Sequence, residues 1–150
     1  GHNMAAGFTL KKNNLNNFKN YIFDDFSKIG AFRNNTFSYD AEVSSIAFNK
    51  NFYTDIKKIE PFGTGNPNPT FLFKDLKVVK STILNNKHIS VILKSKIGFS
   101  IKSISFNSTN NQVGEYLLNY KKTFNVLGHI NENIWNNKKT LQLTIRDVIL

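Results

Sequence analysis

The stretch that organises this chain lies between residues 59 and 71 and reads Ile59-Glu60-Pro61-Phe62-Gly63-Thr64-Gly65-Asn66-Pro67-Asn68-Pro69-Thr70-Phe71. It holds every proline of the chain, together with Gly63 and Gly65. Each proline fixes φ, removes a backbone donor and disfavours helix at the preceding residue, whereas glycine reaches φ values closed to other residues. Neither helix nor strand can run through it. We therefore expect a turn-rich connector at residues 61–70, and we interpret it as a structural strut rather than a ligand loop.

Before the connector, apolar spacing predicts two helices with a strand between them. The first has apolar residues three and four apart, at Leu15, Phe18, Ile22, Phe26 and Ile29. We expect Asn13 or Asn14 to cap it and Gly30 to lie beyond its end. A strand is expected over 37–43, and the second helix should open at Asn49 or Asn51 and stop before Pro61. These elements do not make a complete fold, so residues 1–60 are interpreted as the end of a domain that begins upstream.

After the connector, the apolar pattern changes to period two. It predicts strands over 71–84, 87–94, 98–106, 123–131 and 141–148, with a helix over 111–119. Three strands, a helix and two more strands is the chain order of an OB-fold, a five-stranded Greek-key barrel. The predicted class is thus α+β: a partial α/β segment followed by an OB-fold barrel.

The same periodicity predicts which side chains fill the barrel. The expected inward residues are Ile89, Val91, Leu93, Phe124, Val126, Ile130, Leu141, Leu143 and Ile145. Ile101 and Ile104 have opposite parity, so we expect a bulge near Lys102 or Ser103. Five phenylalanines are interpreted mainly as core residues: Phe71, Phe73, Phe99, Phe106 and Phe124.

Composition limits the class of protein. The 150 residues are 40% apolar, which is enough for a core. No apolar run reaches the roughly 18 residues of a membrane span, and residues 4–10 are too short for a signal peptide, so we expect a cytoplasmic protein with no membrane partner. The lack of cysteine excludes disulfides and thiolate metal sites.

The net charge of +10 is unevenly distributed along the chain. Residues 1–70 carry 8 basic and 6 acidic side chains, whereas residues 71–150 carry 12 basic and 4 acidic ones. A polyanionic partner would therefore bind the second half. A lysine-rich face that only maintains solubility explains the composition equally well.

Three groups of residues resemble a known family. They are Gly1-His2-Asn3-Met4-Ala5-Ala6-Gly7-Phe8, the stretch from 59 to 71, and the pairs and triplets Lys87-His88, Ser105-Phe106-Asn107 and Leu141-Gln142-Leu143. Together they resemble the C-terminal part of the RecJ family, bacterial exonucleases specific for single strands. The first group resembles the closing motif of the DHH-associated domain. The resemblance assigns residues 1–60 to the end of that domain and residues 71–150 to the OB domain.

The resemblance implies 5′ to 3′ removal of nucleotides from single-stranded DNA by a DHH domain that holds manganese or magnesium. This sequence has no Asp-His-His triplet, and its ten acidic residues are scattered. We therefore expect no catalytic residue, no metal site and no nuclease activity in this segment alone. The implied partners are single-stranded DNA, an upstream DHH catalytic domain of the same protein and single-strand-binding protein, in a bacterial cytoplasm.

OB-folds bind nucleic acid on strands two and three and on the loops that join strands one to two and four to five. Basic and aromatic residues occur near these places: Lys87, His88, Lys94, Lys96 and Lys102 by strands two and three, Trp135, Lys138 and Lys139 in the four-to-five loop, and Arg146 facing outward on strand five. Lysines can follow phosphates and an exposed tryptophan can stack on a base.

Several of these residues have a plainer interpretation. We expect Trp135 to pack on the barrel end more readily than to stack on a base. His88 and His129 lie in strands, where a lone histidine is usually hydrogen-bonded and structural. His2 is carried over from the family motif as a phosphate contact, but it is equally a mobile terminal residue. The OB module itself either grips single-stranded DNA or acts as a structural or protein-docking domain.

Overall fold

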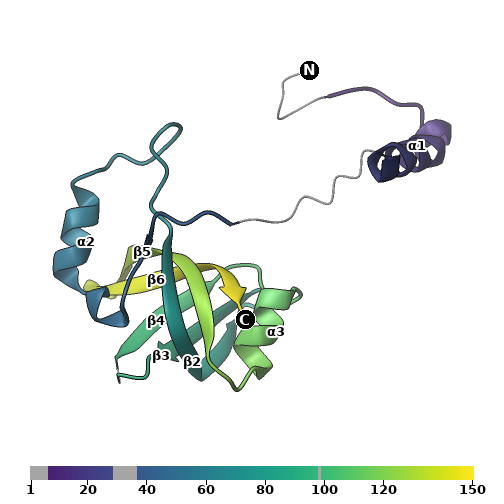
Figure 1. The fold of residues 1–150 in the computed structure, drawn as a ribbon. Coiled ribbons are helices and arrows are strands. Elements are labelled where there is room, and N and C mark those ends of the chain that lie inside the picture. The colour runs from purple at the N-terminus through teal and green to yellow at the C-terminus, as the bar shows by residue number, and fades with distance from the viewer. Residues whose placement is uncertain (1–6, 29–36, 98) are drawn as a thin grey trace. The chain divides into compact units, whose positions relative to one another are not determined.

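The structure is a computed structural model that describes residues 7–28, 37–97 and 99–150. It separates into two compact units, Gly1–Phe37 and Ser38–Leu150 (Figure 1). In the first unit a 3-10 turn, η1 (Lys12–Asn14), leads into helix α1 (Leu15–Lys28). The predicted amphipathic helix is confirmed, with Asn13 and Asn14 inside the turn that precedes it. Its predicted end at Ile29 and Gly30 lies outside the described residues.

The second unit contains a closed barrel. Its elements are β1 (Ala41–Glu42), η2 (Ser45–Ala47), α2 (Lys50–Lys57), β2 (Phe71–Leu84), β3 (His88–Lys94), β4 (Ser100–Ser105), α3 (Gln112–Asn119), β5 (Phe124–Trp135) and β6 (Lys138–Ile149). Strands pair in the order β2-β3-β4-β6-β5, and β5 pairs back onto β2. The contact between β4 and β6 is parallel, and the other barrel pairs are antiparallel. The predicted α+β class and the OB-fold are confirmed.

The segment before the connector packs onto this barrel. Asn49 is the cap of α2, because its side chain accepts a hydrogen bond from the Phe52 amide at 3.0 Å. Ile56 is buried in the barrel's core cluster, and the Phe52 ring lies 5.4 Å from that of Phe71. The compact unit therefore begins at Ser38, ahead of the residue 71 at which the OB domain was expected to start. The assignment of residues 1–60 to the end of a DHH-associated domain stays a prediction.

The strand expected over 37–43 is shorter than predicted. Only Ala41 and Glu42 pair with a neighbour, and they lie parallel to the start of β2. The residue before this strand, Asp40, makes two hydrogen bonds to Thr70. The Asp40 amide donates to the Thr70 carbonyl at 2.8 Å, and the Asp40 carboxylate accepts from the Thr70 amide at 2.7 Å. The segment is therefore an edge contact of the barrel.

The first part of the connector is held by local hydrogen bonds, whereas its last residues bond to Asp40 and His129. Gly63 and Asn66 form an isolated bridge, and the Asn66 side-chain amide donates to the carbonyls of Ile59 at 2.8 Å and Pro61 at 2.9 Å. Gly65 has φ 86°, in the left-handed region that favours glycine. These internal bonds are those of a structural turn.

The barrel interior follows the predicted parity. All the predicted inward residues are buried except Leu141, which is half-buried at the edge of the core. Helix α3 packs against β2, β3 and β6 at one end of the barrel (Figure 1). A Cβ on Gly114 of α3 would lie 1.8 Å from the Ser108 carbonyl oxygen, so this close approach requires glycine.

The bulge predicted in β4 is wrong. β4 pairs with β3 one to one over its whole length, from Ser105 opposite Ile89 to Ser100 opposite Lys94. The inward residues are Ile101, Ser103 and Ser105, which leaves Ile104 on the outer face. The Ser103 hydroxyl donates to the Ile101 carbonyl at 3.3 Å, so this small polar side chain is buried with a partner. Register shifts occur instead in β2 and between β5 and β6, where Leu127 pairs with Asp147 and Gly128 with Ile145.

Two of the five phenylalanines expected in the core lie on the surface. Phe71, Phe73 and Phe124 are buried, whereas Phe99 and Phe106 are 51% and 54% exposed. Both lie just outside the ends of β4, where strand alternation no longer directs a side chain inward.

Candidate nucleic-acid interface

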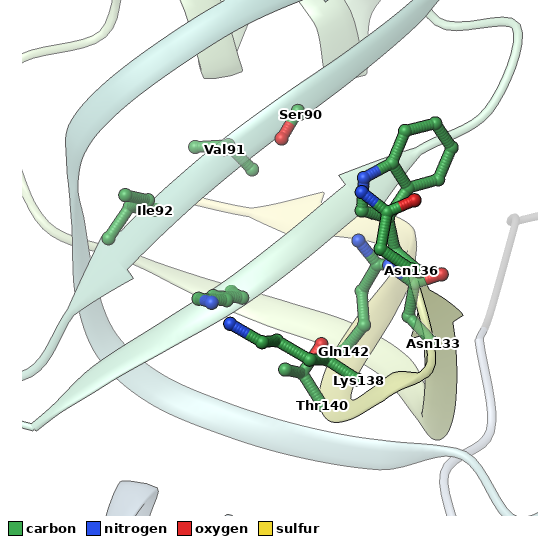
Figure 2. Close-up of a pocket in the computed structure, with 10 residues that line it drawn as sticks. Ser90, Val91, Ile92, Asn133, Asn136, Lys138, Thr140 and Gln142 are labelled. Atoms are coloured by element: carbon green, nitrogen blue, oxygen red, sulfur yellow. The ribbon is translucent and has the colours of Figure 1, made fainter.

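An open hollow of about 540 Å³ lies on the outer face of β3 and β4. The β5–β6 hairpin forms its opposite wall. Figure 2 shows Ser90 and Ile92 on a strand at one side, with Asn133, Lys138 and Thr140 on the hairpin at the other. The lining residues are Ser90, Val91, Ile92, Lys102, Asn133, Trp135, Asn136, Lys138, Thr140 and Gln142. We call this hollow the groove. It lies on the face at which the sequence analysis expects nucleic acid to bind.

The groove exists because two strands separate. β4 and β6 pair only at Ser103–Leu143 and Ile104–Thr144. In contrast, β5 and β6 pair as far as Trp135–Lys138, so the hairpin continues outward after it has left β4. The space between β4 and the diverging hairpin is the groove.

The hairpin also corrects a prediction. Trp135, Lys138 and Lys139 were expected in a loop, but they lie at the paired ends of β5 and β6. Asn136 and Asn137 form the two-residue turn, with φ of 47° and 58°. Asparagine tolerates this left-handed conformation, and such turns match the twist of paired strands. The strands therefore pair to the tip, and this pairing sets the backbone positions of the three residues.

Trp135 does not pack on the barrel end as expected. Its side chain is 73% exposed, because the hairpin tip extends past the elements that could cover it. The indole nevertheless lines the groove beside Lys138. An exposed aromatic ring in a basic groove is a suitable surface for base stacking.

Strand pairing aligns lysines across the outer face. Lys102 of β4 lies opposite Ile92 of β3, and Lys77 of β2 lies directly opposite Lys94 of β3. Lys80 pairs with Ile92 from the other side. We define the basic stripe by the lysines on this face and hairpin: Lys77, Lys80, Lys94, Lys102 and Lys138. Within the described parts of the chain, none of these five joins an ion pair.

Lys77 and Lys80 were missed by sequence reasoning. Their outward parity was available, but the register that aligns them with β3 was not. Like charges directly opposite each other on neighbouring strands are destabilising, as for Lys77 and Lys94. A polyanion bound across the stripe would remove this repulsion.

Two of the predicted lysines that do not line the groove form ion pairs. Lys96 Nζ is 3.5 Å from Asp75 Oδ2, and Lys139 Nζ is 3.2 Å from Glu132 Oε2. Lys139 follows Lys138 on β6, so alternation directs it to the other face of the hairpin. Part of the charge of both lysines is neutralised by a neighbouring carboxylate.

The remaining predicted residues are dispersed. Lys87 is exposed in the turn between β2 and β3, and His88 begins β3 with its Nδ1 accepting from the Asn107 amide at 3.0 Å. Arg146 is exposed on β6, with Nη1 3.4 Å from His129 Nε2. His129 Nδ1 lies 2.8 Å from the Pro69 carbonyl, so both strand histidines have the structural hydrogen bonds expected of them. His2 lies outside the described residues.

Neither a metal site nor a membrane helix is found in the described residues. Across 7–28, 37–97 and 99–150, no three His, Cys, Asp or Glu side chains come together as metal ligands. The donor set of the described part therefore does not fit the manganese or magnesium that the family resemblance implies. No helix in these ranges is long and apolar enough to cross a membrane.

The strand order, the position of α3 and the groove over β3 and β4 define the second unit as an OB-fold domain. The model of the RecJ OB domain family matches residues 39–147, almost the whole of this unit. The chain belongs to this family.

Individual relatives agree. The chain is 28% identical over 158 aligned positions to the single-stranded-DNA-specific exonuclease RecJ of Bacillus subtilis (strain 168), and the match covers 98% of the chain and 19% of that protein. Two crystal structures of RecJ from Thermus thermophilus, in complex with Mg²⁺ and with Mn²⁺, share the fold with TM-scores of 0.62 and 0.63 at 18% identity. They cover 96% and 95% of the chain, and the chain covers 21% and 20% of them. It thus spans about a fifth of these relatives.

Proposed function

We propose that this chain is the C-terminal part of a RecJ-like 5′ to 3′ single-stranded-DNA exonuclease, and that its OB barrel holds single-stranded DNA in the groove. The observation that carries the proposal is the meeting of Lys102, Lys138 and the exposed Trp135 around one hollow. The contribution of this segment is binding and positioning. Bond cleavage belongs to a DHH domain upstream, and the purified segment releases no nucleotides even with manganese.

The chemistry of the groove suits an unpaired strand. Lysines that neutralise phosphates release counterions, which gives sequence-independent and salt-dependent binding. An indole can stack on any base, with about 1 to 3 kcal/mol per base, but only when that base is not stacked within a duplex. The basic stripe supplies the electrostatic contribution to binding, and Trp135 supplies the stacking contribution.

The assembly around the segment is part of the same proposal. The DHH catalytic domain of the same polypeptide receives the strand from the groove, and single-strand-binding protein is a further partner in the bacterial cytoplasm. The resemblance to RecJ suggests both, and the relatives' length, about five times that of this chain, supports the further domain.

Oligo-dT titration at several salt concentrations tests the binding role. The fluorescence anisotropy of a labelled oligonucleotide should report binding that weakens steeply with salt. The log–log slope for single strands is about −0.7 per phosphate neutralised, so the five lysines of the stripe set a limit of about −3.5. Undetectable binding at low salt, or an affinity that does not change with salt concentration, would instead favour a structural or protein-docking role. Unlabelled duplex of the same length should compete poorly.

A further inference from the structure

A second aromatic side chain is held in the open at the other end of β4. Phe106 follows the last residue of β4 and is 54% exposed. Its one aromatic neighbour among the described ring pairs is His88, whose ring centroid lies 5.2 Å away at an interplanar angle of 76°. The two rings meet at a steep angle and are not stacked, and more than half of the Phe106 side chain stays exposed.

The turn that carries Phe106 is firmly anchored. The Asn107 amide donates to His88 Nδ1 at 3.0 Å, and the Ser108 amide donates to the Lys87 carbonyl at 2.9 Å. The hydroxyls of Ser108 and Thr109 donate to the carbonyls of Ser105 and Asn86, each at 3.1 Å. These bonds tie the end of β4 to the β2–β3 hairpin. The turn next to Phe106 is therefore held in place while the Phe106 side chain is exposed, so a ligand that stacks on it has little main chain to order.

His88 adds a directed hydrogen-bond donor. Because Nδ1 accepts the Asn107 N–H, the neutral imidazole carries its proton on Nε2. The strand alternation of β3 places His88 on the same outer face as Ser90 and Ile92, both of which line the groove. The pair of rings thus continues the groove along β3.

We propose that Phe106 and His88 form a second nucleotide subsite, in which the phenyl face stacks on a base and His88 Nε2–H donates to an oxygen of the same nucleotide. The proposal rests on the proposed function, since the occupant is the strand already bound at Trp135. The distance between the two aromatic residues follows from the strand register, because Trp135 pairs with Lys138 and Thr144 pairs with Ile104. Six residues along β6 and two beyond Ile104 give roughly 26 Å at about 3.3 Å per residue. The basic stripe lies between the two aromatic ends.

The length dependence of oligo-dT binding tests this subsite. In the wild-type chain, affinity should rise stepwise once the oligonucleotide can reach from Trp135 to Phe106. Phe106→Leu, which keeps an apolar side chain against His88 but removes the ring, should abolish that step. The affinity for long oligonucleotides should decrease about fivefold to 150-fold, which is the equivalent of one lost stacking contact. Phe106→Trp should restore the step.

The outcomes separate the two proposals. If Phe106→Leu binds oligo-dT of every length as tightly as the wild type does, while Trp135→Ala binds it more weakly, the second subsite is wrong. DNA binding in the groove is then still supported. If the wild type binds no oligonucleotide of any length, the proposed function itself fails. An NMR spectrum in which the Phe106 ring signals shift only with the longer oligonucleotides would support the subsite directly, and unchanged signals would contradict it.

Discussion

The two faces of β3 and β4 are built from alternate residues of the same strands, yet they follow different rules. On the inner face Ile89, Val91 and Leu93 are almost fully buried, and their identity is set by volume and shape. On the outer face Ile92 and Lys102 lie beside each other on the surface, and no packing requirement fixes a lysine there. Substitutions inside should therefore change stability and leave binding intact, and substitutions outside should do the reverse.

The largest effect is expected inside. Leu143 is fully buried and lies opposite Ser103, where β6 meets β4. Leu143→Ala should lower the free energy of unfolding by about 2 to 5 kcal/mol, because it removes buried methyl groups and leaves a cavity. Urea denaturation followed by circular dichroism measures the loss. A change below about 1 kcal/mol would show that the barrel interior is loosely packed; oligo-dT affinity of the folded variant should not change.

This inner face is also what could be predicted from sequence. Period two alone assigned Ile89, Val91 and Leu93, and the order of elements gave the OB-fold. The error in β4 arose because Ile104 was assumed to need burial. In the structure Ser103 is buried instead, with its hydroxyl bonded to the Ile101 carbonyl. Hydrophobicity predicts burial poorly where a small polar residue can satisfy itself on its own backbone.

On the outer face, charge reversal should have the next largest effect. Lys102→Glu with Lys138→Glu places two carboxylates in the groove, and should weaken oligo-dT binding by more than tenfold, about 1.4 kcal/mol. The magnitude of the log–log salt slope should decrease by about 1.4, because two phosphate contacts are lost. Unfolding free energy should stay within about 0.5 kcal/mol of the wild type, since both are surface substitutions.

A matched pair controls for total charge. Lys96→Glu with Lys139→Glu changes the net charge equally, but acts on lysines that face Asp75 and Glu132 outside the groove. It should weaken binding much less than the groove pair. Equal losses for the two pairs would mean that overall charge, and not the groove, determines binding.

Removal of the indole should have a smaller effect. Trp135→Ala should weaken binding about fivefold, near the lower end of the stacking range, because so exposed a ring contacts a base on one face. Ile134→Ala is the control, since this neighbour is 59% exposed and does not line the groove. Quenching of the single tryptophan's fluorescence by oligo-dT would report the contact, and no quenching at saturation would argue against it.

The outer face was harder to predict because its geometry depends on long-range pairing. Lys102 and Lys138 were identified from their place in the strand order. Lys96 and Lys139 were grouped with them because the sequence does not show their ion pairs with Asp75 and Glu132. Those pairs form only once the strands are folded against each other. Phe106 was assigned to the core on hydrophobicity, although it lies just past the end of a strand, where alternation no longer applies.

The smallest effect is expected at an ion pair on the barrel's edge, far from any role in binding. Lys74 Nζ lies 2.6 Å from Glu42 Oε2 and ties β2 to β1. Its hydrogen bond to Glu42, followed by the attraction of that carboxylate, raises the pKa of Lys74 above its usual value of 10.5. A raised pKa in the folded state means that the pair stabilises the fold below pH 10.5, and that this contribution is lost as the pH rises through the folded value. Lys74→Met should therefore lower the urea midpoint slightly at pH 8, and the difference from wild type should shrink above pH 10.5. Lys77→Met removes a β2 lysine that lies opposite Lys94 and has no ion pair among the described residues, so it should relieve repulsion and not lower the midpoint at pH 8. If it lowers the midpoint as Lys74→Met does, the loss at Lys74 cannot be assigned to the bond to Glu42.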